Sequence, residues 1–585
     1  MRKIKFLSTL ALVGTAVFGL TACSSSDDAA NTTGNPDAQS YISVNITNVG
    51  SAATRAIDGY EYGTPDESDI KKVRFYFFNA DGTPYNLTNS TPVGVNYLEK
   101  DVTMTGGGDD SKTVENKSNV ILVIEGNRGA SPATMIAVAN PQSLDASTLG
   151  TNSLSVDQLR SADLKTTKYA TNDGKDFVMS NSAYDNNGAS TCSALTTGHV
   201  FTSQDAAKAD PVDIYVERIV AKVSTTKSTA TDSKWTTING KDAYAVGKYG
   251  TNTIYAVIDG WGVADENGRT PITKNIGSNS DRTTWASTLG FTPWTTADYH
   301  RSFWEISTPF ISGGTADNQP QNHSFKSYTS AFGSSLYTFP NTPTEAATAD
   351  EANKSNSPTY RTKVLLAAHL MYKNSEGNYV DAPICEYKGY QYISEADVKN
   401  VILSENTNIY VKKGDSYSNL TADDITFATP AANSSLKDYQ VTARLVNTTD
   451  NGMYYKLNSG AKAGSTNASD YTAISLADVN TALSASPAEI RHEGMAYYYT
   501  SIRHLGAAES NLGYYGVVRN HLYKVTINSI KGFGTPVYDP NRVIVPIVPS
   551  NAETYLAARI NVLQWRVVNS TVDLDATNTA TNTDK

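Results

Sequence analysis

The 585-residue sequence is poor in cysteine, methionine and charge: it has 3 Cys and 7 Met, and Asp, Glu, Lys and Arg make up only 18%. The net charge is −10, and no Lys- or Arg-rich run offsets it. This balance argues against nucleic acid as a partner, because phosphates require a basic surface. No Cys/His pair has zinc-ligand spacing, and the HExxH, GxSxG, Walker and dinucleotide glycine patterns are missing. We therefore expect no catalytic residues, no metal site and no cofactor.

The residues that are abundant favour β structure. The chain has 35 Tyr together with many Thr, Ser and Asn. Tyr and Thr suit half-buried strands, whereas Asn and Gly suit turns. A chain of this length exceeds one ordinary core, so two or more domains are expected. The sequence therefore predicts a mainly β protein with two β-sandwich domains and few short helices.

The N-terminus has the pattern of an export signal. Arg2, Lys3 and Lys5 are followed by an apolar stretch, 6–20, which is too short to span a bilayer. No later apolar run approaches that length. Leu20–Cys23 resembles a bacterial lipobox, which predicts a signal peptide over 1–22 and lipidation at Cys23. The alternative is an ordinary signal peptide with a chance cysteine. Residues 24–39 have the composition of a disordered tether.

A short strand and a lone arginine follow the tether. Ile42, Val44 and Ile46 alternate with polar residues over 41–49, as in a strand with one buried face. Arg55 is the only Lys or Arg between positions 5 and 71, so a trypsin-like protease has one target there, before Ala56. The alternative is an ordinary surface arginine. Loss of the strand by cleavage would expose sheet edges and an apolar groove.

The body of the chain contains further alternating segments. We predict strands at 73–78, 120–124, 135–139 and 212–223, and short helices at 156–164 and 394–404. The domain division is expected at 206–210, which gives an N-terminal domain over 56–209 and a C-terminal domain over 210–566. An insertion with extended loops is expected at about 412–486, where Asn, Ser, Thr and Ala dominate.

A second exchangeable strand is predicted at the C-terminus, in a terminal segment over 567–585. Val568, Val572 and Leu574 share one face of an alternating segment, with the small Ser570 between them. Such a strand can serve as a donor that another sheet accepts. The alternative is that it is simply the last strand of its own domain.

The remaining polar groups have simpler interpretations. Cys192 and Cys385 are expected to be buried free thiols, with a disulfide between them as the alternative. We predict that His504 and His521 are buried and hydrogen-bonded. The acidic run 66–69 lacks the spacing of a calcium loop and is expected to form a solvated turn.

Several segments, in order, resemble the Bacteroidales fimbrillins, the Mfa/FimA group that builds type V pili. Besides Cys23 and the 54–56 site, the matching segments are Met135–Pro141, Phe177–Ser182, Val216–Val223, Ile502–Leu505, Tyr515–Tyr523 and Ile560–Leu574 with Trp565 in its middle. The match is nearest to shaft subunits of the Mfa type. The resemblance implies transthyretin-like, Greek-key sandwich domains. It also implies a lipidated precursor on the outer membrane, with a propeptide over 23–55 that an arginine-specific protease removes.

In that family, the vacated groove accepts the C-terminal strand of the next subunit, and the product is an adhesive surface fimbrium. The partners implied are identical subunits arranged head to tail, accessory anchor and tip proteins, the protease, and host or bacterial receptors. Two alternatives stay open: a fimbrial tip or anchor subunit, and a surface lipoprotein that binds glycans through clustered tyrosines such as those at 497–499.

Overall fold

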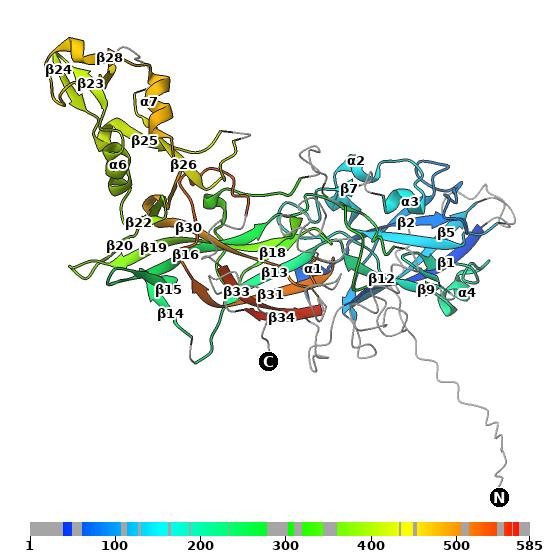
Figure 1. The fold of residues 1–585 in the computed structure, drawn as a ribbon. Helices are drawn as coiled ribbons and strands as arrows, with labels where there is room; N and C mark the ends of the chain where they lie inside the picture. The colour runs from blue at the N-terminus through cyan, green and yellow to red at the C-terminus, as the bar shows by residue number, and fades with distance from the viewer. Residues whose placement is uncertain are drawn as a thin grey trace, which may run out of the picture.

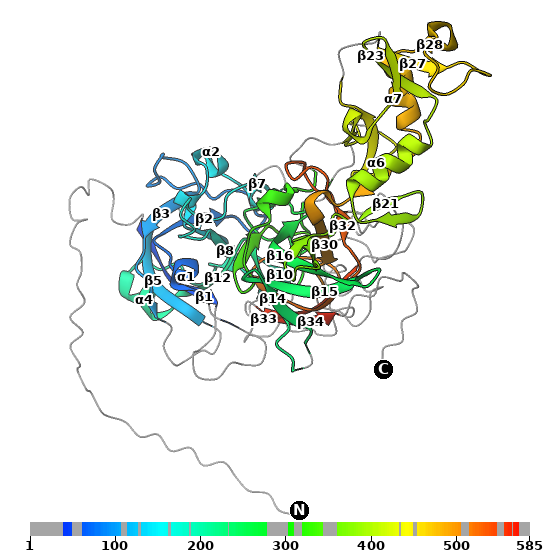
Figure 2. The same cartoon turned by 90° about the vertical axis from the view of Figure 1, so that its left-hand side faces the viewer.

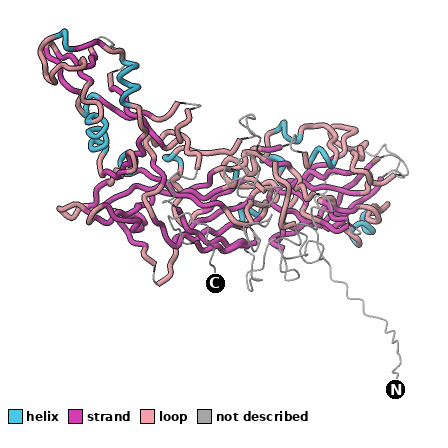
Figure 3. Tube along the Cα trace, viewed as in Figure 1, coloured by secondary structure: helices cyan, strands magenta, loops and turns pink. Residues whose placement is uncertain are grey.

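A computed structural model shows the chain as a set of β-sheets with few short helices (Figure 3). The structure describes residues 39–49, 61, 63–106, 114–126, 130–161, 165–186, 189–231, 233–277, 302–308, 310, 319–342, 360–431, 434–447, 453–504, 514–546, 555–563 and 566–572. The export signal, Cys23, Arg55, Ala56, Trp565 and Leu574 lie outside these residues. Among the described helices, none is long and apolar enough to cross a membrane. The predicted mainly β class is confirmed.

The N-terminal unit is built on one nine-stranded sheet with the order β3-β2-β6-β8-β12-β1-β5-β4, in which β11 also pairs with β6 (Figure 1). Its strands are β1 (Gln39–Val49), β2 (Lys72–Phe78), β3 (Tyr97–Asp101), β4 (Thr105–Gly106), β5 (Val114–Glu125), β6 (Thr134–Ala139), β8 (Met179–Asn181), β11 (Ala194–Leu195) and β12 (Val212–Arg218). Its helices are α1 (Pro65–Ser68), α2 (Ala146–Leu149), α3 (Val156–Leu159) and α4 (Gln204–Ala209), with the 3-10 turn η2 (Pro141–Ser143). A small hairpin joins β9 (Tyr184–Asn186) to β10 (Ala189–Thr191).

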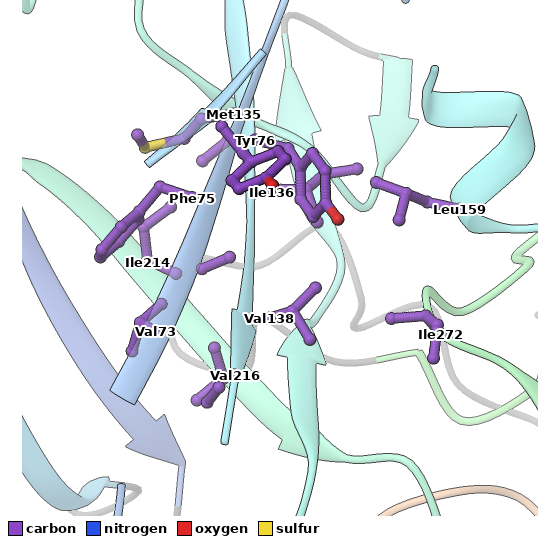
Figure 4. Close-up of a cluster of buried hydrophobic side chains, with 14 of the residues drawn as sticks. Val73, Phe75, Tyr76, Met135, Ile136, Val138, Leu159, Ile214, Val216 and Ile272 are labelled. Atoms are coloured by element: carbon purple, nitrogen blue, oxygen red, sulfur yellow. The ribbon is translucent and has the colours of Figure 1, made fainter. Parts of the chain in front are cut away.

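The core of this unit lies against the strands in the middle of the sheet. Figure 4 shows Val73 and Phe75 of β2, Ile136 of β6 and Ile214 of β12 gathered in one cluster. Ile272, which comes from the following unit, belongs to the same cluster and is fully buried. The first unit therefore shares its core with the next. A two-stranded pairing of β7 (Lys165–Thr166) with β17 (Thr270–Pro271) also joins the two units.

The C-terminal sandwich consists of two sheets. One has the order β18-β13-β31-β33-β34, and the other has the order β14-β15-β16-β19-β30-β32 with β20 paired to β19. Their strands are β13 (Ala221–Lys227), β14 (Trp235–Ile238), β15 (Lys241–Tyr249), β16 (Asn252–Ala264), β18 (Ser335–Thr338), β19 (Lys363–Lys373), β20 (Tyr379–Asp381), β30 (Met495–Ser501), β31 (His521–Lys531), β32 (Thr535–Pro536), β33 (Tyr555–Leu563) and β34 (Arg566–Val572); two 3-10 turns, η5 (Phe325–Ser327) and η9 (His492–Gly494), accompany them. Side chains of β13 and β31 pack against those of β16 and β19 in one core, as a sandwich requires.

A third unit, residues 385–490, projects from the sandwich in both views (Figures 1 and 2). One sheet has the order β22-β21-β29-β26-β25, and the other has the order β24-β23-β27-β28. Its elements are β21 (Cys385–Tyr387), β22 (Tyr390–Tyr392), α6 (Glu395–Ser404), β23 (Ile409–Lys413), β24 (Ser416–Asn419), η7 (Ala422–Asp424), β25 (Ile425–Ala428), β26 (Gln440–Leu445), β27 (Tyr454–Leu457), η8 (Ala468–Asp470), β28 (Tyr471–Ala473), α7 (Leu476–Leu483) and β29 (Ala488–Ile490). Because this projecting unit has its own buried core, the expectation of extended loops over 412–486 is corrected.

Another sequence prediction also needs correction. The single strand predicted over 212–223 is two strands, because the chain crosses from one sheet to the other at Ile219 and Val220. β12 belongs to the N-terminal sheet, whereas β13 belongs to the sandwich. The chain therefore changes sheets one strand after the division expected at 206–210. Both residues at the crossing are fully buried, so the apolar pattern continues through the break and hides it.

Candidate strand-exchange site

β1 lies inside the N-terminal sheet, with a neighbour on each side. It runs parallel to β12, from Val44 opposite Val212 to Asn48 opposite Val216. It runs antiparallel to β5, and that pairing begins with Gln39 opposite Glu125 and continues to the end of the strand. A strand in this position satisfies backbone groups on both of its edges. Its removal would divide the sheet and leave two unpaired edges.

The side chains of β1 are part of the core. Ile42 and Val44 are fully buried in the cluster that also holds Ile214 and Leu122. The predicted orientation of these two residues toward the core is confirmed. For Ile46 the structure describes the backbone, which pairs with Ile214 and Ser118. Ser43 is buried as well, so the prediction of one buried face is too simple, since α4 packs against the strand.

The chain after the linker is fastened to the C-terminal sandwich. Glu61 makes an ion pair with Lys524 of β31, and Glu67 of α1 makes an ion pair with Lys222 of β13 at 2.6 Å. The Glu67 side chain is 1% exposed, and it also accepts a hydrogen bond from Tyr337. Cleavage in the linker would therefore free β1 and leave the chain from Glu61 onward held in place.

The electrostatics of Glu67 reflect its burial. Burial alone would raise the pKa of this carboxyl, but the charges of Arg218 and Lys222 outweigh that effect and lower the pKa below 4.5. Arg218 is itself fully buried, and its Nε donates to the backbone oxygen of Glu67 at 2.8 Å. Its Nη1 donates to Asn520 Oδ1 at 3.1 Å, which ties β12 to the residue just before β31. The sequence has no periodic signal for this junction, because its paired residues are far apart along the chain.

The predicted donor segment lies in the C-terminal sandwich. β34 pairs antiparallel with β33 and parallel with β31, at the outer edge of a sandwich sheet. One edge of β31 is shared between the two strands: β33 pairs with Leu522–Lys524 and Ser529–Lys531, and β34 pairs with His521 and Val525–Ile527. The pairing of β34 is therefore less continuous than that of β1. Val568 and Val572 lie in β34, which in this structure pairs with its own chain.

The predicted buried histidines form part of a buried polar network at the start of β31. His504 and His521 are 3% and 2% exposed, which confirms their burial. The ring of His504 contacts the backbone oxygen of Phe303 at 2.7 Å and the hydroxyl of Tyr523 at 2.9 Å. Next to them, Arg519 donates through its backbone N and its Nε to both carboxylate oxygens of Glu305, each at 2.8 Å. These hydrogen bonds connect the chain near Phe303 and Glu305 to the start of β31, and the side chains that make them are buried.

Other candidate groups lie in interior positions. Cys192 and Cys385 are free and buried, as predicted, and burial raises the pKa of each thiol to about 12. Tyr497 and Tyr498 are 4% and 2% exposed. Tyr498 packs in the sandwich core and Tyr497 packs in a second buried cluster with Phe325 and Val537, so neither ring forms an exposed platform for sugars. Within the described residues, no cluster of three or more His, Cys, Asp or Glu could hold a metal ion.

Comparison with known proteins supports the fimbrial resemblance. Residues 491–571 match the family model described as "Major fimbrial subunit protein type IV, Fimbrillin, C-terminal". The predicted resemblance to the fimbrillins is confirmed in this region. The matched region runs from η9 to β34, so it includes both predicted motifs with buried histidines and Val568 of the predicted donor, while Val572 and Leu574 lie beyond it. No curated protein matches the sequence.

Solved structures of fimbrial and adhesion proteins are similar to the chain over long stretches. A presumed cell adhesion protein from Parabacteroides distasonis ATCC 8503 is 12% identical, covers 89% of this chain and 96% of its own, and gives a TM-score of 0.32. A fimbrial assembly protein from the same organism is 14% identical over 60% of this chain and 85% of its own, with a TM-score of 0.24. The tip fimbrial protein Mfa3 from Porphyromonas gingivalis, with C-terminal truncation, is 11% identical over 59% and 83%, with a TM-score of 0.22.

Proposed function

We propose that this chain is the structural subunit of a surface fimbria and polymerises by donor-strand exchange. The precursor is a lipoprotein, held at the outer membrane through Cys23 and cleaved after Arg55 by an arginine-specific protease. The observation that carries the proposal is the position of β1, which fills the space between β12 and β5 and precedes a linker containing Arg55. The match of residues 491–571 to a fimbrial subunit family supports the same function.

The vacated space provides the driving force for assembly. Removal of β1 withdraws Ile42 and Val44 from the core, and burial of each such side chain is worth about 1.5–3 kcal/mol. The unpaired edges of β12 and β5 also lose ladder hydrogen bonds, each worth about 0.5–1.5 kcal/mol net. A strand from another subunit that restores these contacts is bound by the same interactions. The donor and acceptor sites differ, so the joint is head to tail and extends into a filament.

The C-terminal strand is the proposed donor. β34 lies at a sheet edge, and its departure leaves β13 and β31 paired with each other. Two apolar residues on its proposed donor face, Val568 and Val572, are four positions apart, the same spacing as Ile42 and Ile46 of the strand to be replaced. The anchoring of Glu61 and Glu67 keeps the rest of the subunit intact while β1 leaves.

The proposed function implies particular partners and a particular location for the subunit. The partners are identical subunits, with accessory anchor and tip proteins at the ends of the fibre and receptors on host or bacterial surfaces. The mature subunit belongs to a surface fimbrium, and the precursor is lipid-anchored.

The deciding experiment is mass spectrometry of the N-terminus of protein sheared from cells. We expect a start at Ala56, in species that run as high-mass ladders without boiling. A lipidated Cys23 on a monomer, with no Ala56 species, would contradict the proposal and favour an anchor subunit or a glycan-binding lipoprotein.

A variant tests the donor strand separately. Val572→Asp places a charge on the proposed donor face, so we expect processing at Arg55 to continue while the ladders disappear. Val93→Asp is the matched control, because Val93 is 77% exposed and lies on no sheet edge given above. Ladders of normal length in the Val572→Asp protein would rule out this strand as the donor.

A further inference from the structure

A partly open pocket of about 430 Å³ lies between the N-terminal unit and the C-terminal sandwich. Tyr169 contributes from the N-terminal side, and Glu266, Arg269, Gln321 and Phe339 contribute from the sandwich side. Pockets of this size at domain junctions are common positions for small-molecule sites. Nothing in the strand-exchange proposal uses this pocket.

Arg269 is the unusual residue of the pocket. It is only 5% exposed, yet its Nε has no hydrogen-bond partner, and its guanidinium makes no ion pair with any described residue. The other buried arginines behave differently: Arg519 is held by Glu305, and Arg491 donates to several backbone oxygens. Burial of an unpaired charge is strongly unfavourable, so a buried guanidinium is ordinarily paired. The fold nevertheless fixes Arg269 in place, because the next residue begins β17, which pairs with β7.

The neighbouring charges leave Arg269 uncompensated. Glu266 is directed to His323, whose Nε2 lies 3.2 Å from Glu266 Oε1, and this hydrogen bond raises the pKa of His323. When protonated, His323 offsets the charge of Glu266. The cation of Arg269 is then the charge that the pocket offers to a ligand.

The rest of the lining favours a ligand with both polar and apolar faces. The ring of Tyr169 lies 5.9 Å from that of Phe339 and 5.7 Å from that of Tyr337, measured between centroids, which forms an aromatic wall. The Tyr169 hydroxyl and the second oxygen of Glu266 make no hydrogen bonds with described residues, so they are available to ligand hydroxyl groups. An aliphatic carboxylic acid has no hydroxyl groups to bind the Tyr169 hydroxyl and the Glu266 oxygen, so it would leave both without partners.

We propose that this pocket binds a carboxylated sugar, with the ligand carboxylate on Arg269 and the sugar ring against Tyr169. A guanidinium is planar and matches a carboxylate with two parallel hydrogen bonds. An aromatic ring packs on the apolar face of a sugar, while Glu266 and Tyr169 serve its hydroxyl groups. The site would give the subunit a receptor-binding function that is independent of its polymerisation.

Calorimetry with the mature full-length protein tests the site, with glucuronic acid and N-acetylneuraminic acid as probes. Glucose and N-acetylmannosamine are the neutral controls, and acetate and inorganic phosphate are the free-anion controls. We expect at least one acid to bind and Arg269→Met to weaken it by about 10- to 100-fold, the range for loss of a charged hydrogen bond. Lys248→Met, which removes an exposed cation on β15, should leave binding unchanged.

Thermal unfolding distinguishes a ligand-binding role for Arg269 from a structural one. Because Arg269→Met removes an unpaired buried charge, its melting temperature should equal or exceed that of the wild type. A clear fall would assign Arg269 to stability and overturn the proposal. It is also overturned if neither acid binds, if neutral sugars bind equally well, or if acetate and phosphate bind as tightly as the acids. The last result would identify a simple anion site.

Discussion

Val44 of β1 lies opposite Val212 of β12 in a parallel pair, while on its other side it faces Val120 of β5 in an antiparallel pair. The side chain of Val44 is fully buried. The strand proposed to leave the protein is therefore one of its best-paired strands. Under the proposed function, such a strand would depart only after cleavage and in exchange for a replacement strand. That requirement would let a precursor be stable alone and still assemble after processing.

The contribution of β1 can be measured with Val44→Ala. We expect the precursor to lose about 1.5–3 kcal/mol of unfolding free energy, because the substitution removes buried methyl groups. Val93→Ala is the matched control and should change stability by less than about 0.5 kcal/mol, since that side chain is 77% exposed. Urea unfolding of both variants provides the comparison.

The same variant reports on strand departure. In fibres sheared from cells, Val44→Ala should have no effect on stability, because β1 is absent from the mature subunit under our proposal. Equal destabilisation of precursor and fibre would show that β1 remains in the sheet after processing.

A second prediction concerns the buried pair between Arg519 and Glu305, whose side chains are 0% and 1% exposed. Glu305→Gln leaves the guanidinium without its counter-charge, so we expect a loss of about 3–5 kcal/mol. Asp438→Asn breaks the pair with Arg542, whose side chains are 49% and 29% exposed, and should cost about 1 kcal/mol or less. Similar losses from the two substitutions, measured by denaturant unfolding, would contradict this account.

The stability of the junction should depend on pH through Glu67. Its pKa in the folded protein lies below the ordinary value of 4.5, so the ionised carboxylate stabilises the fold above about pH 4.5. This contribution is lost as the pH falls through the lower, folded pKa. Glu67→Gln should destabilise the protein at pH 7 by about 3–5 kcal/mol and remove this part of the acid dependence. Glu376→Gln, at an exposed turn, is the control. Thermal unfolding of both variants and the wild type over about pH 3 to 7 measures the difference.

Patterns within a few neighbouring residues were enough to predict some of the strands and helices. The alternation of Ile42 and Val44 identified β1, and Ser394 correctly marked the start of α6, where its side chain accepts from the backbone of Asp397. Both features depend on residues that are near one another in sequence. The same reasoning failed at 212–223, since an apolar run has no signal for the point at which a chain passes between two sheets.

The position of β1 between two strands could not be predicted from its own residues. Its partners begin at Val114 and Val212, and pairing over such distances is decided by the whole sheet. Arg269 was missed for a similar reason: nothing around it in the sequence distinguishes an unpaired buried arginine from a surface one. The core of the projecting unit was also hidden, because short strands rich in Ser and Thr have the composition of loops.

The projecting unit should be removable as a whole. Its first and last residues, Cys385 and Ile490, are opposite each other in an antiparallel pair, and the backbone N of Arg491 donates to the backbone oxygen of Ile384 at 3.3 Å. Cα atoms paired in this way are only about 4.5–5.5 Å apart, so a short Gly-Ser linker can replace 385–490 without moving the sandwich. Deletion removes three charged contacts with the sandwich: Arg491–Glu386 at 3.7 Å, His492–Glu395 at 2.5 Å and Arg542–Asp438 at 2.7 Å. Because the carboxylate in each is at least 22% exposed, we expect the shortened protein to keep cooperative unfolding within about 1–2 kcal/mol of the intact chain. The isolated unit should also unfold cooperatively, since its core is its own. Loss of the sandwich transition in calorimetry would show instead that the unit is required for the fold.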